Sequence, residues 1–107
     1  MELGEIEAVL CDVFGFSIED ARSHLEAVDI ISTVNGFITI RNHWIDELYV
    51  KPESRGHGIG IQLMKSAIQQ GGKRLKCRSE LREYYEQLGF VVQFTAEEGE
   101  HCYMAIP

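Results

Sequence analysis

The sequence predicts an α/β protein of the α+β kind, in which a mixed sheet carries helices on both faces. Two apolar stripes with helical spacing open the chain, and alternating apolar residues then flank Asn35-Gly36, a strong hairpin signal. A strand, a glycine-rich turn, a helix and a further strand follow over residues 44–77. An antiparallel hairpin together with one β-α-β crossover requires both kinds of strand pairing in one sheet.

Two helices are expected at the start of the chain. Apolar residues recur at helical spacing between residues 2 and 13, and Gly15 ends this stripe. Ser17 followed by Asp20 is typical of an N-cap with an acidic first turn. The pattern therefore predicts a second helix that continues to about residue 26.

Three strands are expected next, separated by two turns of residues that tolerate unusual backbone angles. The strands cover residues 30–34, 37–41 and 44–50, and the turns are Asn35-Gly36 and Asn42-His43. Lys51-Pro52 closes the third strand, because proline cannot donate to a strand ladder.

The second half of the chain predicts alternating helices and strands. Apolar residues at 61, 64 and 68 indicate a helix that ends at Gly71-Gly72. The expected elements are a helix over 59–70, a strand over 74–77, a helix capped by Ser79 and ending at Gly89, and strands over 90–94 and 102–106. The complete order is α-α-β-β-β-α-β-α-β-β.

Composition indicates one globular domain, residues 1–107. The chain is 45% hydrophobic and 25% charged, and no apolar run approaches the roughly 20 residues of a membrane helix. The N-terminus lacks the basic region of a secretory signal, so we expect a cytoplasmic protein without a membrane partner. Three cysteines without a CxxC pair predict free, mostly buried thiols and no metal site.

The net charge of −7 is unevenly distributed. Segment 51–82 holds eight Lys and Arg residues against two Glu residues, which is +6, and the remainder carries −13. The basic segment favours an anionic ligand. The acidic remainder argues against general nucleic-acid binding and suits a cationic substrate such as an amine.

The basic segment contains a glycine-rich loop, Arg55-Gly56-His57-Gly58-Ile59-Gly60, between a strand and a helix. The first N–H groups of a helix lack partners, and the helix dipole is positive there. Glycines let an anion approach the main chain. The loop therefore predicts a phosphate-binding site.

This loop resembles the signature Gln/Arg-x-x-Gly-x-Gly/Ala of the GCN5-related N-acetyltransferase (GNAT) superfamily. A second landmark, a tyrosine before Gly-Phe, is matched by Tyr85 and Gly89-Phe90. The resemblance covers roughly residues 17–106 and is sharp over 48–90. It implies the GNAT fold, a compact single-domain member, and acetyl-CoA as co-substrate.

The resemblance also implies which residues bind acetyl-CoA. The main-chain N–H groups of the loop and first helical turn would hold the pyrophosphate. Leu48 and Val50 would pair with the pantetheine amides, where the sheet splays and leaves strand groups unpaired. The implied pyrophosphate residues are Arg55, Gly56, His57, Gly58, Ile59, Gly60 and Ile61.

Acetyl transfer to an amine needs a base and a proton for the leaving thiolate. By resemblance Tyr85 is the acid; the structural alternative is a core or rim tyrosine, which Tyr84 fits better. We expect Glu47 as base, because its face is shared with Tyr49 and its length reaches an amine; Asp46 is expected on the face of Leu48. A salt bridge is the structural alternative for Glu47, and the alternative base is Asp46, His43 or a water.

Two further residues leave alternatives open. Cys77 lies near the expected thioester, so an acetyl-cysteine intermediate is conceivable, but a buried structural thiol is favoured. Arg78 stands where many family members carry an asparagine that contacts the cofactor.

The resulting hypothesis is an acetyl-CoA-dependent N-acetyltransferase that acts on a primary amine by direct transfer. The acceptor is a small molecule or a protein lysine or N-terminus. The alternatives are an acyl-CoA-binding sensor or interaction module without turnover, and a protein-modifying effector. The short N-terminal region leaves room for a homodimer that completes the sheet edge or the cleft.

Overall fold

A computed structural model describes all residues, 1–107, and its element order is the predicted one. No helix in it has the length and apolarity needed to cross a membrane. The helices are α1 (Leu3–Asp12), α2 (Ile18–Ala27), α3 (Ile59–Gln69) and α4 (Arg82–Glu86); the strands are β1 (Asp29–Ser32), β2 (Gly36–Arg41), β3 (Trp44–Val50), β4 (Arg74–Arg78), β5 (Val91–Ala96) and β6 (His101–Ala105); the 3-10 turns are η1 (Pro52–Ser54), η2 (Ser79–Leu81) and η3 (Glu97–Gly99).

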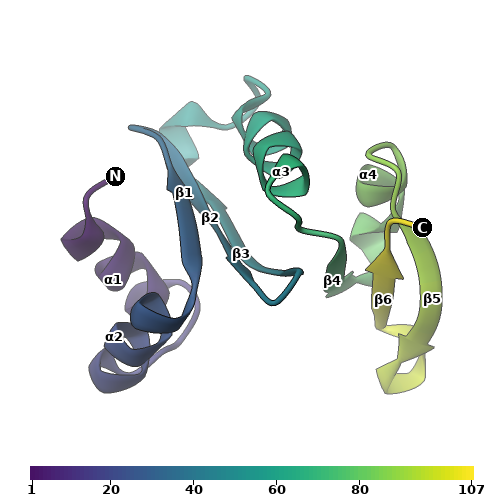
Figure 1. Ribbon diagram of the computed structural model, residues 1–107, viewed down its shortest axis with the longest axis horizontal. Coiled ribbons are helices and arrows are strands. Elements are labelled where there is room, and N and C mark those ends of the chain that lie inside the picture. The colour runs from purple at the N-terminus through teal and green to yellow at the C-terminus, as the bar shows by residue number, and fades with distance from the viewer.

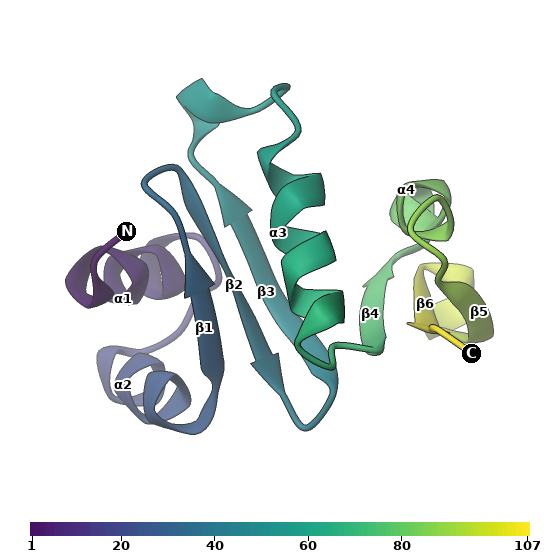
Figure 2. The same cartoon turned by 45° about the horizontal axis from the view of Figure 1, so that its top comes forward.

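The six strands form one mixed sheet in the order β1-β2-β3-β4-β6-β5. All neighbours are antiparallel except β3 and β4, which confirms the expected mixed sheet. The parallel pairing is confined to Trp44 opposite Arg74. Beyond this point β3 and β4 diverge, with α3 over the gap between their ribbons (Figure 2). The sheet is therefore two halves joined at one end.

Helices cover both faces, as expected. Helices α1 and α2 lie on one side of β1–β3, and α3 lies on the other side (Figure 1). Neighbouring residues of β2 supply the two cores, because strand side chains alternate between faces. Ile38 belongs to the cluster beneath α3, and Phe37 belongs to the cluster beneath α1 and α2; both are fully buried.

The first hairpin is confirmed, but the predicted position of its turn is wrong by one residue. Ser32 pairs with Phe37, and Thr33 accepts hydrogen bonds on Oγ1 from the N–H groups of Asn35 and Gly36. Gly36 already belongs to β2. A Cβ there would lie 2.3 Å from the Tyr49 carbonyl oxygen, so close strand approach explains this glycine.

The helix predicted from Ser79 is shorter than expected. The Ser79 N–H donates to the Glu100 carbonyl at 2.8 Å, and the Ser79 hydroxyl donates to the Gly99 carbonyl. Ser79 is thus tied to the β5–β6 connection and does not cap a helix. The segment forms η2 and then only five residues of α4, and Leu81 is left exposed.

Candidate functional site

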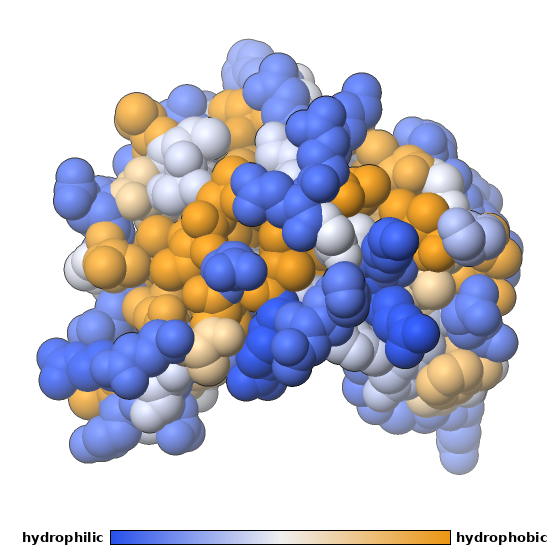
Figure 3. Space-filling view, viewed as in Figure 1, coloured by the Kyte–Doolittle hydropathy of each residue, from blue (hydrophilic) through white to orange (hydrophobic).

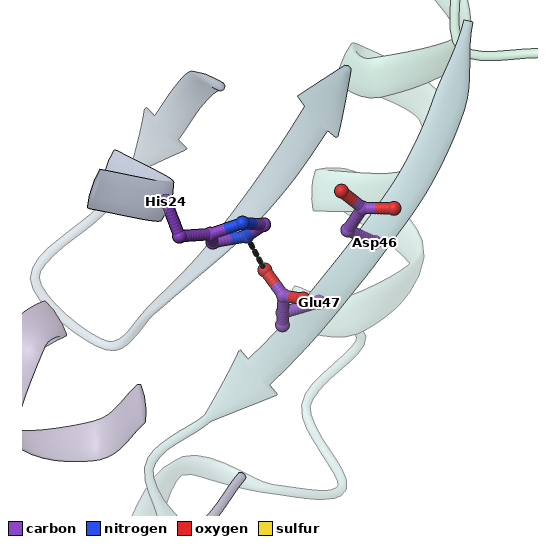
Figure 4. A group of neighbouring side chains, drawn as sticks. All are labelled: His24, Asp46 and Glu47. Atoms are coloured by element: carbon purple, nitrogen blue, oxygen red, sulfur yellow. Dashed lines mark hydrogen bonds and ion pairs between the residues drawn. The ribbon is translucent and has the colours of Figure 1, made fainter. Parts of the chain in front are cut away.

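Strand β3 contains a β-bulge at Asp46 and Glu47. Ile38 pairs with Leu48 and Ile40 pairs with Ile45, so Thr39 alone faces both acidic residues. A bulge re-aims side chains at such a point. The two carboxylates and the His24 ring consequently place one ligating atom each within 4.8 Å of one another (Figure 4). The expectation that Asp46 shares a face with Leu48 is therefore wrong.

Glu47 is a buried carboxylate, 9% exposed, that two other elements hold. Its Oε1 accepts a hydrogen bond from the Thr39 hydroxyl at 2.6 Å, and the Glu47 N–H donates back to the Thr39 oxygen at 2.9 Å. The Nε2 atom of His24, on α2, lies 2.7 Å from the same Oε1. Both contacts of the carboxylate are made by Oε1, and Oε2 has no protein partner. One oxygen therefore remains free to accept a proton.

His24 is a site residue that sequence reasoning missed. Its ring lies against Phe16, with the ring centroids 5.1 Å apart. The one available signal was the cost of a buried carboxylate in a covered strand, which demands a partner. Only the packing of α2 against β2 and β3 identifies that partner as His24.

Asp46 differs from its neighbour because no hydrogen bond holds its carboxylate. Partial burial raises its pKa above the usual aspartate value, and the negative charge of Glu47 raises the pKa further. The Coulombic interactions of Asp46 with His24 and with Arg41 lower its pKa and partly offset these two effects. The bulge therefore places an aspartate with a raised pKa beside the hydrogen-bonded carboxylate of Glu47.

A cleft of about 870 Å³ joins the splayed edge of β3 to the glycine loop and to α4. It brings together most of the residues that the sequence assigned to the co-substrate, together with both tyrosines of α4. Its lining residues are Val13, Phe14, Leu48, Tyr49, Val50, Ser54, Arg55, Gly56, Gly58, Ile59, Gly60, Ile61, Leu81, Tyr84 and Tyr85.

The loop presents free main-chain donors at the start of α3. The N–H groups of Gly56, His57 and Gly58 donate to no protein acceptor. Gly56 and Gly58 have φ values of +83° and +79°, which side-chain-bearing residues rarely adopt. A Cβ at either position would meet no atom within 4 Å. The two glycines therefore serve the curve of the loop and access to its N–H groups.

Arg55 is turned toward the protein, unlike the rest of the loop. Its Nε donates to the Val50 carbonyl at 2.9 Å, and its guanidinium lies 5.9 Å from the centre of the Tyr49 ring. Its main-chain N–H donates to the Pro52 carbonyl at 3.4 Å. In this arrangement neither the Arg55 N–H nor the Val50 carbonyl is free for a ligand.

Tyr85 lines the cleft and is partly buried. Burial raises its pKa to about 12, and Tyr84 and Cys77 add to the shift. Its ring meets those of Tyr84 and Phe90 edge-on, at 5.0 and 6.2 Å, and its hydroxyl makes no protein hydrogen bond. The phenol is therefore neutral at physiological pH. Tyr84 also lines the cleft, with its hydroxyl beside Gly60; the sequence favoured a core or rim position for this residue.

The structure does not bring His43 to this site. Its Nδ1 lies 2.9 Å from the Gly71 carbonyl at the β2–β3 turn, at the end of β3 away from Leu48 and Val50. Cys77 is buried against the Met104 sulfur, and burial raises the pKa of its thiol. Arg78 pairs with Glu80 on the surface at 2.8 Å.

The basic segment does not form a single positive patch. Lys51, Lys76, Arg78 and Arg82 each pair with a glutamate. Arg55 is the only lysine or arginine that lines the cleft. The local charge of +6 is thus a weaker argument for an anion than the free N–H groups and the dipole of α3.

Comparisons with known proteins agree with this geometry. The sequence model of the acetyltransferase (GNAT) domain matches residues 19–92, more than half of the chain. A thialysine N-epsilon-acetyltransferase from Bos taurus is 33% identical over an alignment that covers 59% of this chain and 42% of that protein. The chain thus spans less than half of this curated relative.

Solved structures share the fold. An acyl-CoA N-acyltransferase from Pseudomonas aeruginosa is 18% identical with a TM-score of 0.69, covering 99% of this chain and 90% of that one. The PaiA N-acetyltransferase of Thermoplasma acidophilum, solved in complex with coenzyme A, is 25% identical with a TM-score of 0.57, covering 97% and 78%. These likenesses extend over nearly the whole chain.

Proposed function

Because this chain belongs to the GNAT acetyltransferase family, we propose that it transfers the acetyl group of acetyl-CoA directly to a primary amine. The observation that carries the proposal is the cleft, which connects free main-chain donors, an unpaired strand edge and a neutral tyrosine. The N-acetyltransferase relative and the coenzyme A complex of a structural neighbour support the same reaction class.

The donor half of the cleft fits a CoA molecule. The N–H groups of Gly56, His57 and Gly58 and of the first turn, Ile59 to Ile61, would hold the pyrophosphate at the positive end of α3. Pantetheine would lie along β3 beside Leu48 and Val50, where β4 has diverged. For the Val50 carbonyl to pair with it, Arg55 must release that oxygen and turn to the phosphates.

The acceptor approaches from the side of His24 and Glu47. The Oε2 of Glu47 takes a proton from the amine, directly or through a water, while the amine nitrogen attacks the thioester carbonyl carbon. The carbon–sulfur bond of the tetrahedral intermediate then breaks, and the thiolate leaves. His24 and Thr39 act as positioning residues, because both fix Oε1.

Tyr85 stabilises the departing sulfur. A phenol with a pKa of about 12 is a weaker acid than an ordinary thiol, whose pKa is about 8.5. Complete proton transfer from Tyr85 to the thiolate is therefore uphill. A hydrogen bond from the neutral phenol to the developing thiolate needs no such transfer and strengthens in the transition state.

The test measures CoA binding and turnover separately. CoA should raise the melting temperature, whereas equal concentrations of ATP and NAD should have much smaller effects. Acetyl-CoA should then be consumed in the presence of primary amines. Binding of CoA without turnover on amines or lysine peptides would replace the enzyme by a CoA-binding sensor, and no stabilisation by CoA would remove both functions.

A further inference from the structure

Two arginines and a tryptophan lie in one row on the sheet face opposite α3. Arg41 pairs with Trp44 across β2 and β3, and Trp44 pairs with Arg74 across β3 and β4. Directly opposed residues of neighbouring strands point to the same face. Thr39, which bonds Glu47, is two residues before Arg41 on β2 and therefore shares this face. The row lies beside the proposed base.

Neither arginine of this row is neutralised. Arg41 and Arg74 are exposed, and neither forms an ion pair with a carboxylate within 4.0 Å. The next cation along β4 on the same face, Lys76, is paired with Glu97 at 2.8 Å. The row therefore holds two positive charges without an ion-pair partner on a chain whose net charge is −7, although Arg41 is close enough to Asp46 to lower the pKa of that carboxyl.

The row borders a hollow. Arg41, His24 and Phe16 line a cavity of about 650 Å³. Arg74 lines a second depression with Trp44 and Tyr103. Strongly hydrophilic residues surround the hollow between α2 and the η3 end of β5 and β6 (Figure 3). Phe14 lines both the first cavity and the cleft, so the two lie on either side of this residue.

Aromatic rings form the wall beside Arg74. Trp44 meets Tyr103 edge-on at 6.3 Å, and Tyr103 stacks on Phe94 at 4.5 Å. An apolar wall lowers the local dielectric and strengthens the attraction between a guanidinium and an anion. Trp44 is three residues from Glu47, and the bulge makes this span shorter than the roughly 10 Å of a regular strand. A carboxylate held by the arginines would thus be several methylene groups from an amine at Glu47.

We propose that the acceptor carries a carboxylate as well as its amine, and that Arg41 and Arg74 bind this carboxylate. The inference rests on the proposed function, since it names the acceptor class of the same site. It adds an anionic group to the amine acceptor that the acidic remainder of the chain favoured. An extended 6-aminohexanoate, with about 7–8 Å between carboxyl carbon and nitrogen, matches the required length.

The experiment compares 6-aminohexanoate with its neutral analogue 6-aminohexanamide. The wild-type kcat/KM should favour the carboxylate about tenfold or more, because hydrogen bonds between charged groups are the strong ones. Arg74→Gln and Arg41→Gln should each reduce this preference severalfold, mainly through KM. Lys65→Gln removes the same charge from α3 on the opposite face and should leave the preference unchanged.

The outcomes separate the inference from the proposed function. Acetylation of both amines at equal kcat/KM overturns the inference and leaves acetyl transfer intact. A strong preference for an aminoacylated oligonucleotide overturns it in favour of a nucleic-acid acceptor. If neither amine is acetylated, thermal stabilisation of the CoA-bound protein by 6-aminohexanoate, reduced in Arg74→Gln, supports the carboxylate site while acetyl transfer fails; no such stabilisation overturns the inference.

Discussion

The glycine loop and the β3 bulge lie on neighbouring parts of the sheet but are built in different ways. The loop offers main-chain N–H groups, and six consecutive residues define it, the last two of which begin α3. The bulge site offers side chains from α2, β2 and β3 that are far apart in the sequence. A site made of local backbone is recognisable in a sequence, whereas one made of tertiary side-chain contacts is not.

Among variants of residues that line the cleft, the largest expected effect belongs to Tyr85, where donor and acceptor chemistry meet. Tyr85→Phe removes only the hydroxyl, so the ring contacts with Tyr84 and Phe90 remain. We expect kcat to fall about 10²- to 10³-fold, as for other lost transition-state hydrogen bonds. Tyr84→Phe is the matched control and should retain most activity. Equal losses in both variants would contradict the assignment to Tyr85.

Substitutions in the glycine loop should weaken the affinity for CoA. Gly58 lines the cleft, and in Gly58→Ala the backbone φ of +79° becomes strained by about 1–2 kcal/mol. We expect the Kd for CoA to rise tenfold or more. Gly99→Ala introduces similar strain at φ +88° in η3, outside the lining of the cleft. Loss of CoA affinity in the Gly99 variant as well would indicate a general folding defect.

His24 should affect turnover through Glu47 and leave CoA affinity unchanged. His24→Ala removes one of the two groups that hold Oε1, and we expect kcat to fall about tenfold, consistent with a lost charge-assisted hydrogen bond. His24→Gln keeps an N–H donor near the position of Nε2 and should restore most of the rate. A purely structural role for His24 would lower the melting temperature of His24→Ala without this rescue of kcat.

The smallest expected effect is on stability, at Asp46. Its folded pKa is raised, so protonation favours the folded state, and this contribution is lost as pH rises through the folded pKa. Asp46→Asn should therefore raise the melting temperature at pH 7 and have less effect near pH 3. Asp12→Asn, at an exposed carboxylate outside the cluster, supplies the net-charge baseline. A gain in melting temperature that is independent of pH would contradict the raised pKa of Asp46.

The same contrast explains how much of this molecule could be predicted from sequence. Apolar periodicity predicted the element order, and the glycines that adopt positive φ are part of the loop sequence itself. The element order and the loop could therefore be predicted from the sequence. The extra residue opposite Thr39 could not be predicted, because a bulge depends on the pairing of two strands. This bulge places Asp46 on the opposite face from the expected one. His24 was missed for the same reason: its role exists only once α2 packs over β3. The turn at Gly36 was misplaced because contact with Tyr49, outside the hairpin, explains that glycine.

The central claim is that the glycine loop binds the donor and that the bulge site on β3 abstracts the proton. Steady-state kinetics and CoA titration of Glu47→Gln test it most directly, because Gln keeps the carbonyl oxygen that accepts from Thr39 while it removes the base. We expect kcat to fall about 10²- to 10⁴-fold at an unchanged Kd for CoA. An undiminished kcat, or a loss of CoA affinity that accounts for the loss of rate, would contradict the claim.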